Sequence, residues 1–340
     1  MNFFCKVCRS NQTVQFKISH FYFNIKKALF FFCKNCLSIS EHNNKINKKF
    51  YYSGKYRDLL YKNIKPPIVP WSEISFLRYK HIVKYIKKYI LLKNAKNYLD
   101  FGGYNGFLAY ALKKINPKIN AYVADYDERG LNIAKALGCK VINLKKKKIP
   151  NIKFDLITVV HVLEHLENPG RQLKFLSKKI DKKGIIYAEV PNEKNFPLQD
   201  VSHKINFSEL GLKMLFLKNN FKILKLGFHE TPKETEKYGY FLNTKNENIH
   251  IVASFEKNFY SPLSVINFEG SNFNSKAIVK RYINTNYNKI LFMIAFKYFF
   301  KGIKFLRSFF FIISYATLEK FFLKFFRISL ADLLKKQFHL

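Results

Sequence analysis

The chain has 340 residues, of which 48% are hydrophobic and 17% aromatic, enough for a sizeable core, and this excludes a largely disordered chain. Its formal net charge of +37 favours an anionic partner: nucleic acid, an anionic membrane surface or a phosphorylated substrate. The basic residues are spread along the whole chain, beside abundant Asn, Ile, Phe and Tyr. A nucleotide composition that biases codon choice explains this spread, and we put it ahead of a dedicated nucleic-acid site.

Residues 1–50 carry four of the five cysteines, as the Cys-x-x-Cys pairs Cys5/Cys8 and Cys33/Cys36. Each pair places two thiolates on a tight turn, and two such turns complete a tetrahedral S4 site for a structural zinc ion. A segment this short cannot bury enough apolar surface alone, so we expect the metal to supply folding energy. The alternative is four unrelated buried cysteines. Paired cysteines, with no secretory signal at the start, predict a reducing cytoplasm.

Residues 51–95 are expected to lead into the main domain. Pro66, Pro67 and Pro70 break regular structure, and Ser72 or Ser75 then caps a helix that runs to about Leu92. The apolar positions of this helix recur at helical spacing, which predicts core packing and no chemistry.

The main domain is expected over residues 96–260, where strands alternate with helices. The predicted strands are 98–101, 121–124, 140–143, 154–160 and 184–190, and the predicted helices are 107–115, 128–137 and 170–179. This order predicts an α/β fold, a Rossmann-like doubly wound parallel sheet. A helix near 208–219 and strands at 221–228 and 249–255 follow, and we expect the last two strands to close the sheet as an antiparallel hairpin.

Residues 261–340 are expected to form a basic and aromatic helical C-terminal segment. From residue 288 onward, lysines and arginines repeat at helical spacing opposite Phe and Ile, as in an amphipathic helix. Its longest apolar run, 290–296, is far short of a membrane span. Such a helix can lie at the inner face of an anionic membrane or dock on a partner, and packing on the protein's own core is the alternative.

The segment Tyr98–Gly106 carries the sharpest chemical motif. A hydrophobic strand delivers Asp100 to its carboxyl end, and Gly102, Gly103 and Gly106 then turn the chain into a helix. Glycines let the backbone approach a ligand closely, and ligands of such sheets bind at the carboxyl ends of the strands. A second acid, Asp125, ends the next strand, where a carboxylate can hold two ribose hydroxyls. These two features alone also fit a dinucleotide site.

Four segments in their order and spacing resemble the class I S-adenosylmethionine-dependent methyltransferases. They are "DFGGYNG", "VADYDERGLNIAKALG", "FDLITVVHVLEHLENP" and "KKGIIYAEVPN", and the resemblance covers about residues 95–256. A later segment, "SHKINFSELGLKMLFLKNNFKIL", is similar to the one that precedes the penultimate strand of this family. A zinc module ahead of such a domain resembles sugar-modifying members, which include enzymes of polysaccharide biosynthesis.

The resemblance implies roles for individual residues. Asp100 and the glycines would shape the methionine side of the S-adenosylmethionine pocket, Asp125 would bind the ribose, and Tyr126 would lie against adenine. His161, at the end of the fourth strand, would face the methyl group. Many relatives carry an Asp after the third strand for the adenine amino group, and Asn143 is the substitute here.

A hydroxyl or carbon acceptor needs a general base, and histidine suits neutral pH. The candidates are His161, His165 and His203, with Glu164 as an orienting carboxylate. His161 is expected nearest the methyl group and His203 on a loop over the strand ends, and these two are our choice. His165 and Glu164 are expected on the helix after the fourth strand, where hydrogen bonds to neighbouring backbone are the alternative role.

The expected function is therefore methyl transfer from S-adenosylmethionine to a sugar nucleotide or a glycan building block. An RNA methyltransferase that uses the positive charge is one alternative, which salt-sensitive RNA binding would distinguish. A non-catalytic scaffold acting through the zinc module and the C-terminal segment is the other, and failure to bind S-adenosylmethionine would favour it. The expected location is the cytoplasm, with peripheral membrane contact.

Overall fold

The computed structural model describes residues 3–20, 25–42, 79, 82–192, 203–229 and 248–256. All of these belong to one compact unit, Met1–Phe273. The expected C-terminal helical segment and most of the 51–95 lead-in lie outside the described residues. Among the helices that are described, none is long and apolar enough to cross a bilayer.

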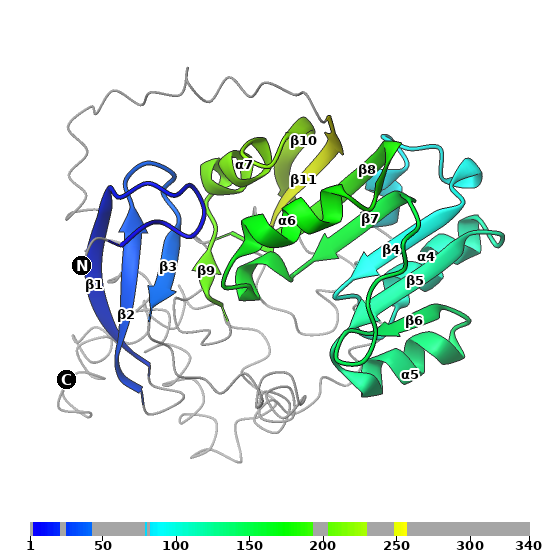
Figure 1. The fold of residues 1–340 in the computed structure, drawn as a ribbon, viewed down its shortest axis with the longest axis horizontal. Helices are drawn as coiled ribbons and strands as arrows, with labels where there is room; N and C mark the ends of the chain where they lie inside the picture. Colours follow the sequence, from blue (N-terminus) through cyan, green and yellow to red (C-terminus); the bar gives the residue numbers. More distant parts are fainter. Residues whose placement is uncertain are drawn as a thin grey trace, which may run out of the picture. The chain divides into compact units, whose positions relative to one another are not determined.

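A seven-stranded sheet forms the centre of the main domain (Figure 1). Five strands run parallel, in the order β8-β7-β4-β5-β6, and β11 and β10 complete the sheet as an antiparallel hairpin beside β8. Their bounds are β4 Asn97–Phe101, β5 Asn120–Asp125, β6 Lys140–Asn143, β7 Phe154–Val160, β8 Ile180–Pro191, β10 Phe221–His229 and β11 Asn248–Phe255. The predicted α/β sheet and its closing hairpin are therefore both present.

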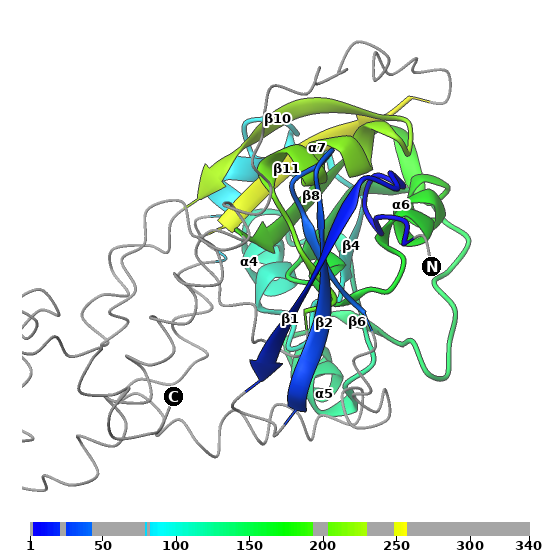
Figure 2. The ribbon, with the colours of Figure 1, turned by 90° about the vertical axis from the view of Figure 1, so that its left-hand side faces the viewer.

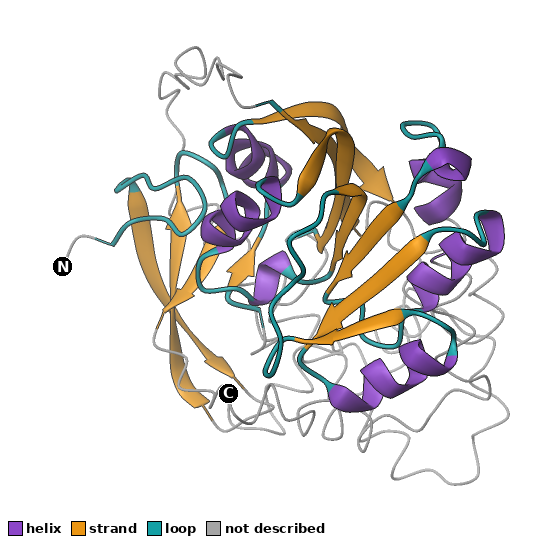
Figure 3. Cartoon of the chain, turned by 45° about the vertical axis from the view of Figure 1, so that its right-hand side comes forward, coloured by secondary structure: helices purple, strands orange, loops and turns teal. Residues whose placement is uncertain are grey.

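Helices cover both faces of this sheet (Figure 3). Their bounds are α4 Phe107–Ile115, α5 Glu128–Ala136, α6 Pro169–Ser177 and α7 Glu209–Leu217. The first two bury Leu108, Leu112 and Leu131 on one face, and the last two bury Leu173 and Leu215 on the other. Because β4 leads outward to β5 and β6, and β7 then begins on the other side of β4, the strand order reverses between β4 and β7. Ligands of doubly wound sheets bind at such a reversal.

Three of these helices begin at a side chain that caps the first turn. Asp127, Asn168 and Ser208 accept hydrogen bonds from backbone N–H groups of α5, α6 and α7. An Asp, Asn or Ser at this position satisfies an amide that the helix itself cannot satisfy. The caps explain why α6 and α7 begin within one residue of their predicted starts.

The lead-in helix is shorter than the sequence predicts. Its described helical residues end at Ile86, and a separate 3-10 turn, η2 (Leu92–Asn94), precedes β4. The side-chain amide of Asn116 donates to the carbonyl oxygens of Leu92 at 2.9 Å and Ala95 at 2.8 Å. This long-range contact stabilises the turn, and the local helical periodicity could not reveal it.

The N-terminal module is a small antiparallel sheet that includes one short strand from the main domain. It contains β1 (Thr13–His20), β2 (Ile25–Cys33) and β3 (Ile39–His42), and β9 (Ile205–Asn206) pairs with the edge of β3 (Figure 1). Figure 2 shows β1 and β2 of this sheet side by side. The predicted boundary at residue 50 does not anticipate this pairing, because β9 lies more than 150 residues further along the chain.

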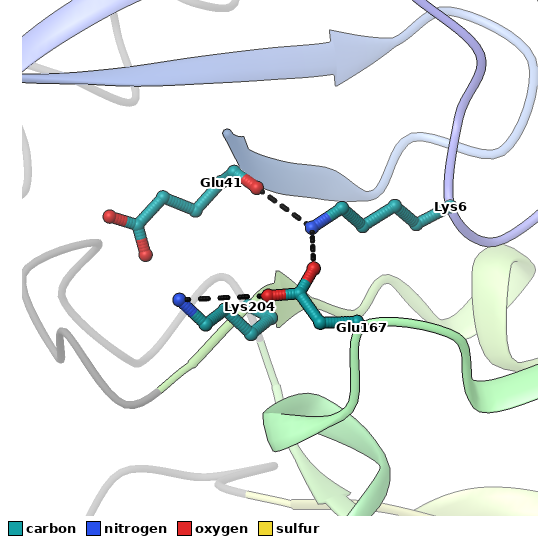
Figure 4. Close-up of polar contacts among 4 residues, drawn as sticks. All are labelled: Lys6, Glu41, Glu167 and Lys204. Atoms are coloured by element: carbon teal, nitrogen blue, oxygen red, sulfur yellow. Dashed lines mark hydrogen bonds and ion pairs between the residues drawn. The ribbon is translucent and has the colours of Figure 1, made fainter. Parts of the chain in front are cut away.

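Polar contacts also join the module to the main domain. The Lys6 ammonium donates to the Glu41 carbonyl at 3.0 Å and contacts the Glu167 carboxylate at 2.6 Å, while Lys204 lies 3.8 Å from that carboxylate (Figure 4). Ser208 donates a hydrogen bond to the Cys36 carbonyl. The Glu167 side chain is half exposed, so its ion pairs stabilise little, and the buried bond at Ser208 is the stronger link.

Candidate functional site

The glycine turn after β4 lies at the reversal of strand order. Gly102 has φ +77°, and a Cβ on it would meet Val162 at 2.3 Å. A Cβ on Gly103 would lie 2.4 Å from the carboxyl carbon of Asp100. Both positions therefore require glycine, one for its backbone conformation and both for space. The turn ends at Gly106, the N-cap of α4, as the sequence predicts.

Asp100 is buried beneath this turn. Its Oδ1 accepts a hydrogen bond from the Thr158 hydroxyl at 2.8 Å, and that hydroxyl lies 2.6 Å from the Tyr98 hydroxyl. Burial raises the pKa of Asp100 to about 7, and the bond from Thr158 opposes the shift. Near neutral pH, the carboxyl is thus poised to ionise when a cationic group binds beside it.

We expect cofactor binding to depend on pH through Asp100. S-adenosylhomocysteine carries the ammonium group of the cofactor, which an ionised Asp100 would favour. Its association constant should therefore fall as the pH is lowered below about 7, approaching about tenfold per pH unit. Because the pKa is raised in the folded state, Asp100 contributes to the free energy of unfolding at acid pH. This contribution is lost as the pH rises from about 4 to about 7.

Calorimetric titration with S-adenosylhomocysteine between about pH 5.5 and 8.5 measures this dependence. Asp100→Asn is the matched variant, because its amide oxygen keeps the hydrogen bond from Thr158 and cannot titrate. We expect weaker binding and no slope in the variant. A flat profile in the wild type over this range would exclude the role of Asp100.

Asp125 ends β5 on the other side of the glycine turn. Its two carboxylate oxygens accept backbone N–H bonds from Tyr104 at 2.9 Å and from Asp127 at 2.8 Å. Each carboxylate oxygen has a second lone pair, so the group has capacity for two further hydrogen bonds. Two adjacent hydroxyls of a ribose would match that capacity.

A pocket of about 520 Å³ lies between Tyr126, the residue after Asp125, and α6. Tyr126, 37% exposed, lines it together with Phe101 and Leu144, which suits the flat face of adenine. Asn143 ends β6 nearby, and its buried Nδ2 has no hydrogen-bond partner among the described residues. An unpaired buried amide fits a polar edge such as that of adenine, so the residues present fit an adenosine group.

His161 follows β7 directly, in a left-handed conformation with φ +53°. Its Nδ1 lies 3.4 Å from Glu164 Oε1 and its Nε2 lies 3.5 Å from Glu189 Oε1. Both carboxylates are almost fully buried, whereas the imidazole is 26% exposed. The ring is therefore held between two acids at the strand end, with access to solvent.

Glu189 has no role predicted from the sequence. Val160 pairs with Glu189 in the parallel register of β7 and β8, so the glutamate lies beside the strand end that leads to His161. Its other oxygen accepts a hydrogen bond from the Tyr187 hydroxyl at 2.7 Å. An acid inside a hydrophobic predicted strand is the signal that could have revealed it.

The other two candidate histidines also meet at this end of the sheet. His165 lies, as expected, on a helix after the fourth strand, but this is the short 3-10 helix η3 (Leu163–His165), and the α-helix α6 begins only at Pro169, after the Asn168 cap. His203, expected on a loop, is buried directly before β9, and its ring centroid lies 5.0 Å from that of His165. The Nε2 of His165 lies 3.8 Å from Glu164 Oε1. The four predicted catalytic residues are thus one cluster.

The four predicted metal-ligating cysteines lie together and buried. The Sγ atoms of Cys5 and Cys36 are 3.6 Å apart, and those of Cys8 and Cys33 are 3.5 Å apart. In a tetrahedral site with Zn–S bonds of about 2.3 Å, the sulfurs are separated by about 3.8 Å. The residues present therefore fit a zinc ion.

The two cysteine turns have the same backbone geometry. The amides of Arg9 and Leu37 donate back to the carbonyls of Cys5 and Cys33, at 3.0 Å and 2.9 Å. Both of these donors have positive φ, 63° and 59°. Hydrogen bonds among the four thiols lower the pKa of Cys8 and Cys33 and raise the pKa of Cys5 and Cys36, as expected when two thiolates accept from two thiols. The lone Cys139 is buried, and burial raises its pKa to about 11.

A family model described as a methyltransferase domain matches residues 73–226. A putative S-adenosylmethionine-dependent methyltransferase from Listeria monocytogenes has 14% identity and a TM-score of 0.42, over 51% of this chain and 97% of that one. A methyltransferase of the same cofactor class from Archaeoglobus fulgidus has 19% identity and a TM-score of 0.43, over 61% and 100%. No protein of curated function matches the chain.

The structural likenesses are distant, so the family match carries the assignment. Residues 73–226 therefore form a methyltransferase domain, and the protein is a methyl-transferring enzyme. The glycine turn and the acids on β4 and β5 fit S-adenosylmethionine as the methyl donor. The alternative of a non-catalytic scaffold is set aside.

Proposed function

We propose that this methyltransferase acts on a sugar nucleotide or a glycan building block, at an atom that must lose a proton before or during methyl transfer. The observation that carries the proposal is the position of His161 between the buried Glu164 and Glu189, at the end of β7. A neutral acceptor hydroxyl requires such a base, whereas a thiolate acceptor would not.

Methyl transfer from a sulfonium is an in-line displacement, so the protein mainly aligns the acceptor with the methyl group. The acceptor oxygen forms a bond to the methyl carbon as the bond from that carbon to sulfur breaks, which leaves S-adenosylhomocysteine. The acceptor proton passes to a ring nitrogen of His161. The two adjacent carboxylates would stabilise the imidazolium that results, and the left-handed backbone of His161 orients its ring.

A phosphorylated acceptor is supported by the charge around the pocket. Beyond Tyr126, the pocket is lined by four basic side chains: Lys147, Lys148, Arg171 and Lys179. His161 does not line this pocket, so these side chains favour a phosphorylated acceptor through the positive field that they add beside the site. The N-terminal cysteine module adds the resemblance to sugar-modifying members of this class.

We also propose that the cysteine cluster holds a structural zinc ion. The paired Sγ atoms and the matching turns support it, and four protein ligands leave no position for a substrate. In this proposal zinc stabilises the module, and the module supports β9 and the segment before it.

Transfer of a labelled methyl group from S-adenosylmethionine to a panel of sugar nucleotides tests the acceptor class. We expect a methylated sugar nucleotide, and we expect His161→Gln to lower kcat by about 10²–10⁴-fold while S-adenosylhomocysteine still binds. His42→Gln, a histidine change in the N-terminal module, is the control and should leave kcat unchanged. Unchanged turnover in His161→Gln would contradict the role of the base.

RNA is the second candidate acceptor, and the net charge of +37 favours it. The same labelled reaction with total RNA, at low and high salt, separates the two candidates. Methylated RNA, with binding that weakens steeply as salt increases, would replace the sugar proposal. Labelled sugar nucleotide together with unlabelled RNA would support the sugar-nucleotide proposal.

A further inference from the structure

Glu164, His165 and His203 form a cluster of side chains that could hold a metal ion, and the proposed base gives no role to the two histidines. One ligand atom from each lies within 4.8 Å of the others. Glu164 and His203 are almost fully buried, and the His165 side chain is 19% exposed. Glu164 and His165 lie on η3, and His203 lies just before β9. The two segments are about 40 residues apart in the sequence.

Backbone hydrogen bonds position these two segments against each other. The Lys204 amide donates to the Glu164 carbonyl at 2.7 Å, and the Glu41 amide of β3 donates to the Lys204 carbonyl at 2.9 Å. The neighbours of His203 and His165 in the chain are thus joined directly. Side chains on segments held in this way need little reorganisation to bind a ligand.

Two histidines and one carboxylate are the donor set of many divalent transition-metal sites. They bind zinc in catalytic sites, and they form the facial triad of non-haem iron. In both cases the remaining coordination positions are open to water or substrate. Ligand atoms that lie within 4.8 Å of one another are close enough for one ion to contact all three.

We propose that Glu164, His165 and His203 bind one divalent transition-metal ion, separate from the cysteine cluster. Glu164 also lies 3.4 Å from His161, so the metal would be adjacent to the proposed base. An acceptor hydroxyl bound at an open position would become more acidic and would lose its proton to His161 more readily. Only this role in methyl transfer rests on the proposed function; metal binding itself does not.

Metal content after equilibrium dialysis of the full chain against zinc tests the site. We expect two zinc ions per chain in the wild type, and one in His165→Ala and in His203→Ala. His42→Ala is the matched control, because it removes a histidine from β3 outside the cluster, and it should retain two. With cobalt as the probe, only the first ion should give the intense near-ultraviolet thiolate bands, and the second should give nitrogen and oxygen ligation.

S-adenosylhomocysteine binding distinguishes loss of the metal from loss of the fold. We expect both variants to bind it within about threefold of the wild type, since Asp100 and Asp125 remain in place. His203→Gln keeps a buried polar side chain, and it should also lose the second ion. One zinc ion in the folded wild type, or two in each histidine variant, would overturn the proposal, whatever the acceptor assay shows.

Discussion

Replacing Cys33 with serine is expected to unfold the N-terminal module. The substitution removes one thiolate from the proposed S4 site, whose metal-binding free energy is about 10–16 kcal/mol in small zinc domains. The module is small, and its described buried apolar side chains, such as Val7, Phe30 and Ile39, are few. Metal binding is therefore expected to be the largest single contribution to its stability.

The effect should extend beyond the module. Loss of β3 removes the pairing partner of β9, and it removes the hydrogen bond from Glu41 to the backbone of Lys204. Lys204 in turn contacts the Glu164 carbonyl, so the cluster at η3 loses one side of its support. Asp100 and Asp125 lie on β4 and β5, which pair within the seven-stranded sheet and not with β3 or β9. We expect S-adenosylhomocysteine binding to persist while methyl transfer falls.

Three measurements check this prediction: zinc content, limited proteolysis within residues 1–42, and S-adenosylhomocysteine binding. Cys139→Ser is the matched control, because Cys139 is also buried but lies far along the chain from both cysteine pairs. It should keep its zinc and its resistance to protease. Full zinc occupancy in Cys33→Ser, or equal loss in Cys139→Ser, would contradict a structural zinc site.

Replacing Asp125 with alanine is expected to weaken S-adenosylhomocysteine binding strongly. Two hydrogen bonds from ribose hydroxyls to a carboxylate contribute about 1.5–3 kcal/mol each. Their loss should weaken S-adenosylhomocysteine binding by about 10²–10⁴-fold. The change also removes the acceptor for the Tyr104 and Asp127 amides, which loosens the glycine turn.

Asp155→Ala separates these two effects. Asp155 likewise accepts two backbone amides, from Lys96 and Asn97, both at 2.8 Å, but it lies at the opposite end of the parallel strands. It should lower the thermal midpoint without changing the affinity for S-adenosylhomocysteine. A similar loss of affinity in both variants would mean that Asp125 acts only on the fold, and unchanged affinity in Asp125→Ala would remove it from the cofactor site.

Much of the site could be predicted because it depends on local sequence. The glycines after β4 need space and a left-handed backbone, and Asp125 ends a strand, so each signal lies within a few residues of its cause. The strands of the sheet were recognisable for the same reason, because alternation of hydrophobic strands with helices is a local pattern. Two Cys-x-x-Cys turns were equally visible.

Other features depend on residues distant in the sequence. The contact of Glu189 with His161 depends on the register of β8 beside β7. The lead-in helix ends early, before a turn that Asn116 stabilises. The strand β9 joins a sheet whose other strands lie before residue 43. The acid inside a hydrophobic strand is a local signal for Glu189, but its partner is not, and the other two features have no signal in the neighbouring residues, because each depends on which segments pack together.

By itself, the sequence determined the class of fold and the methyltransferase domain, and it predicted the residues proposed for acid, base or thiol chemistry. Only the tertiary structure decided that His161 lies between two buried carboxylates, and that Glu164, His165 and His203 converge. The physical reason is the range of the interactions. Backbone conformation and hydrophobic periodicity act over a few residues, whereas the geometry of a site depends on hydrogen bonds and packing between segments that the fold brings together.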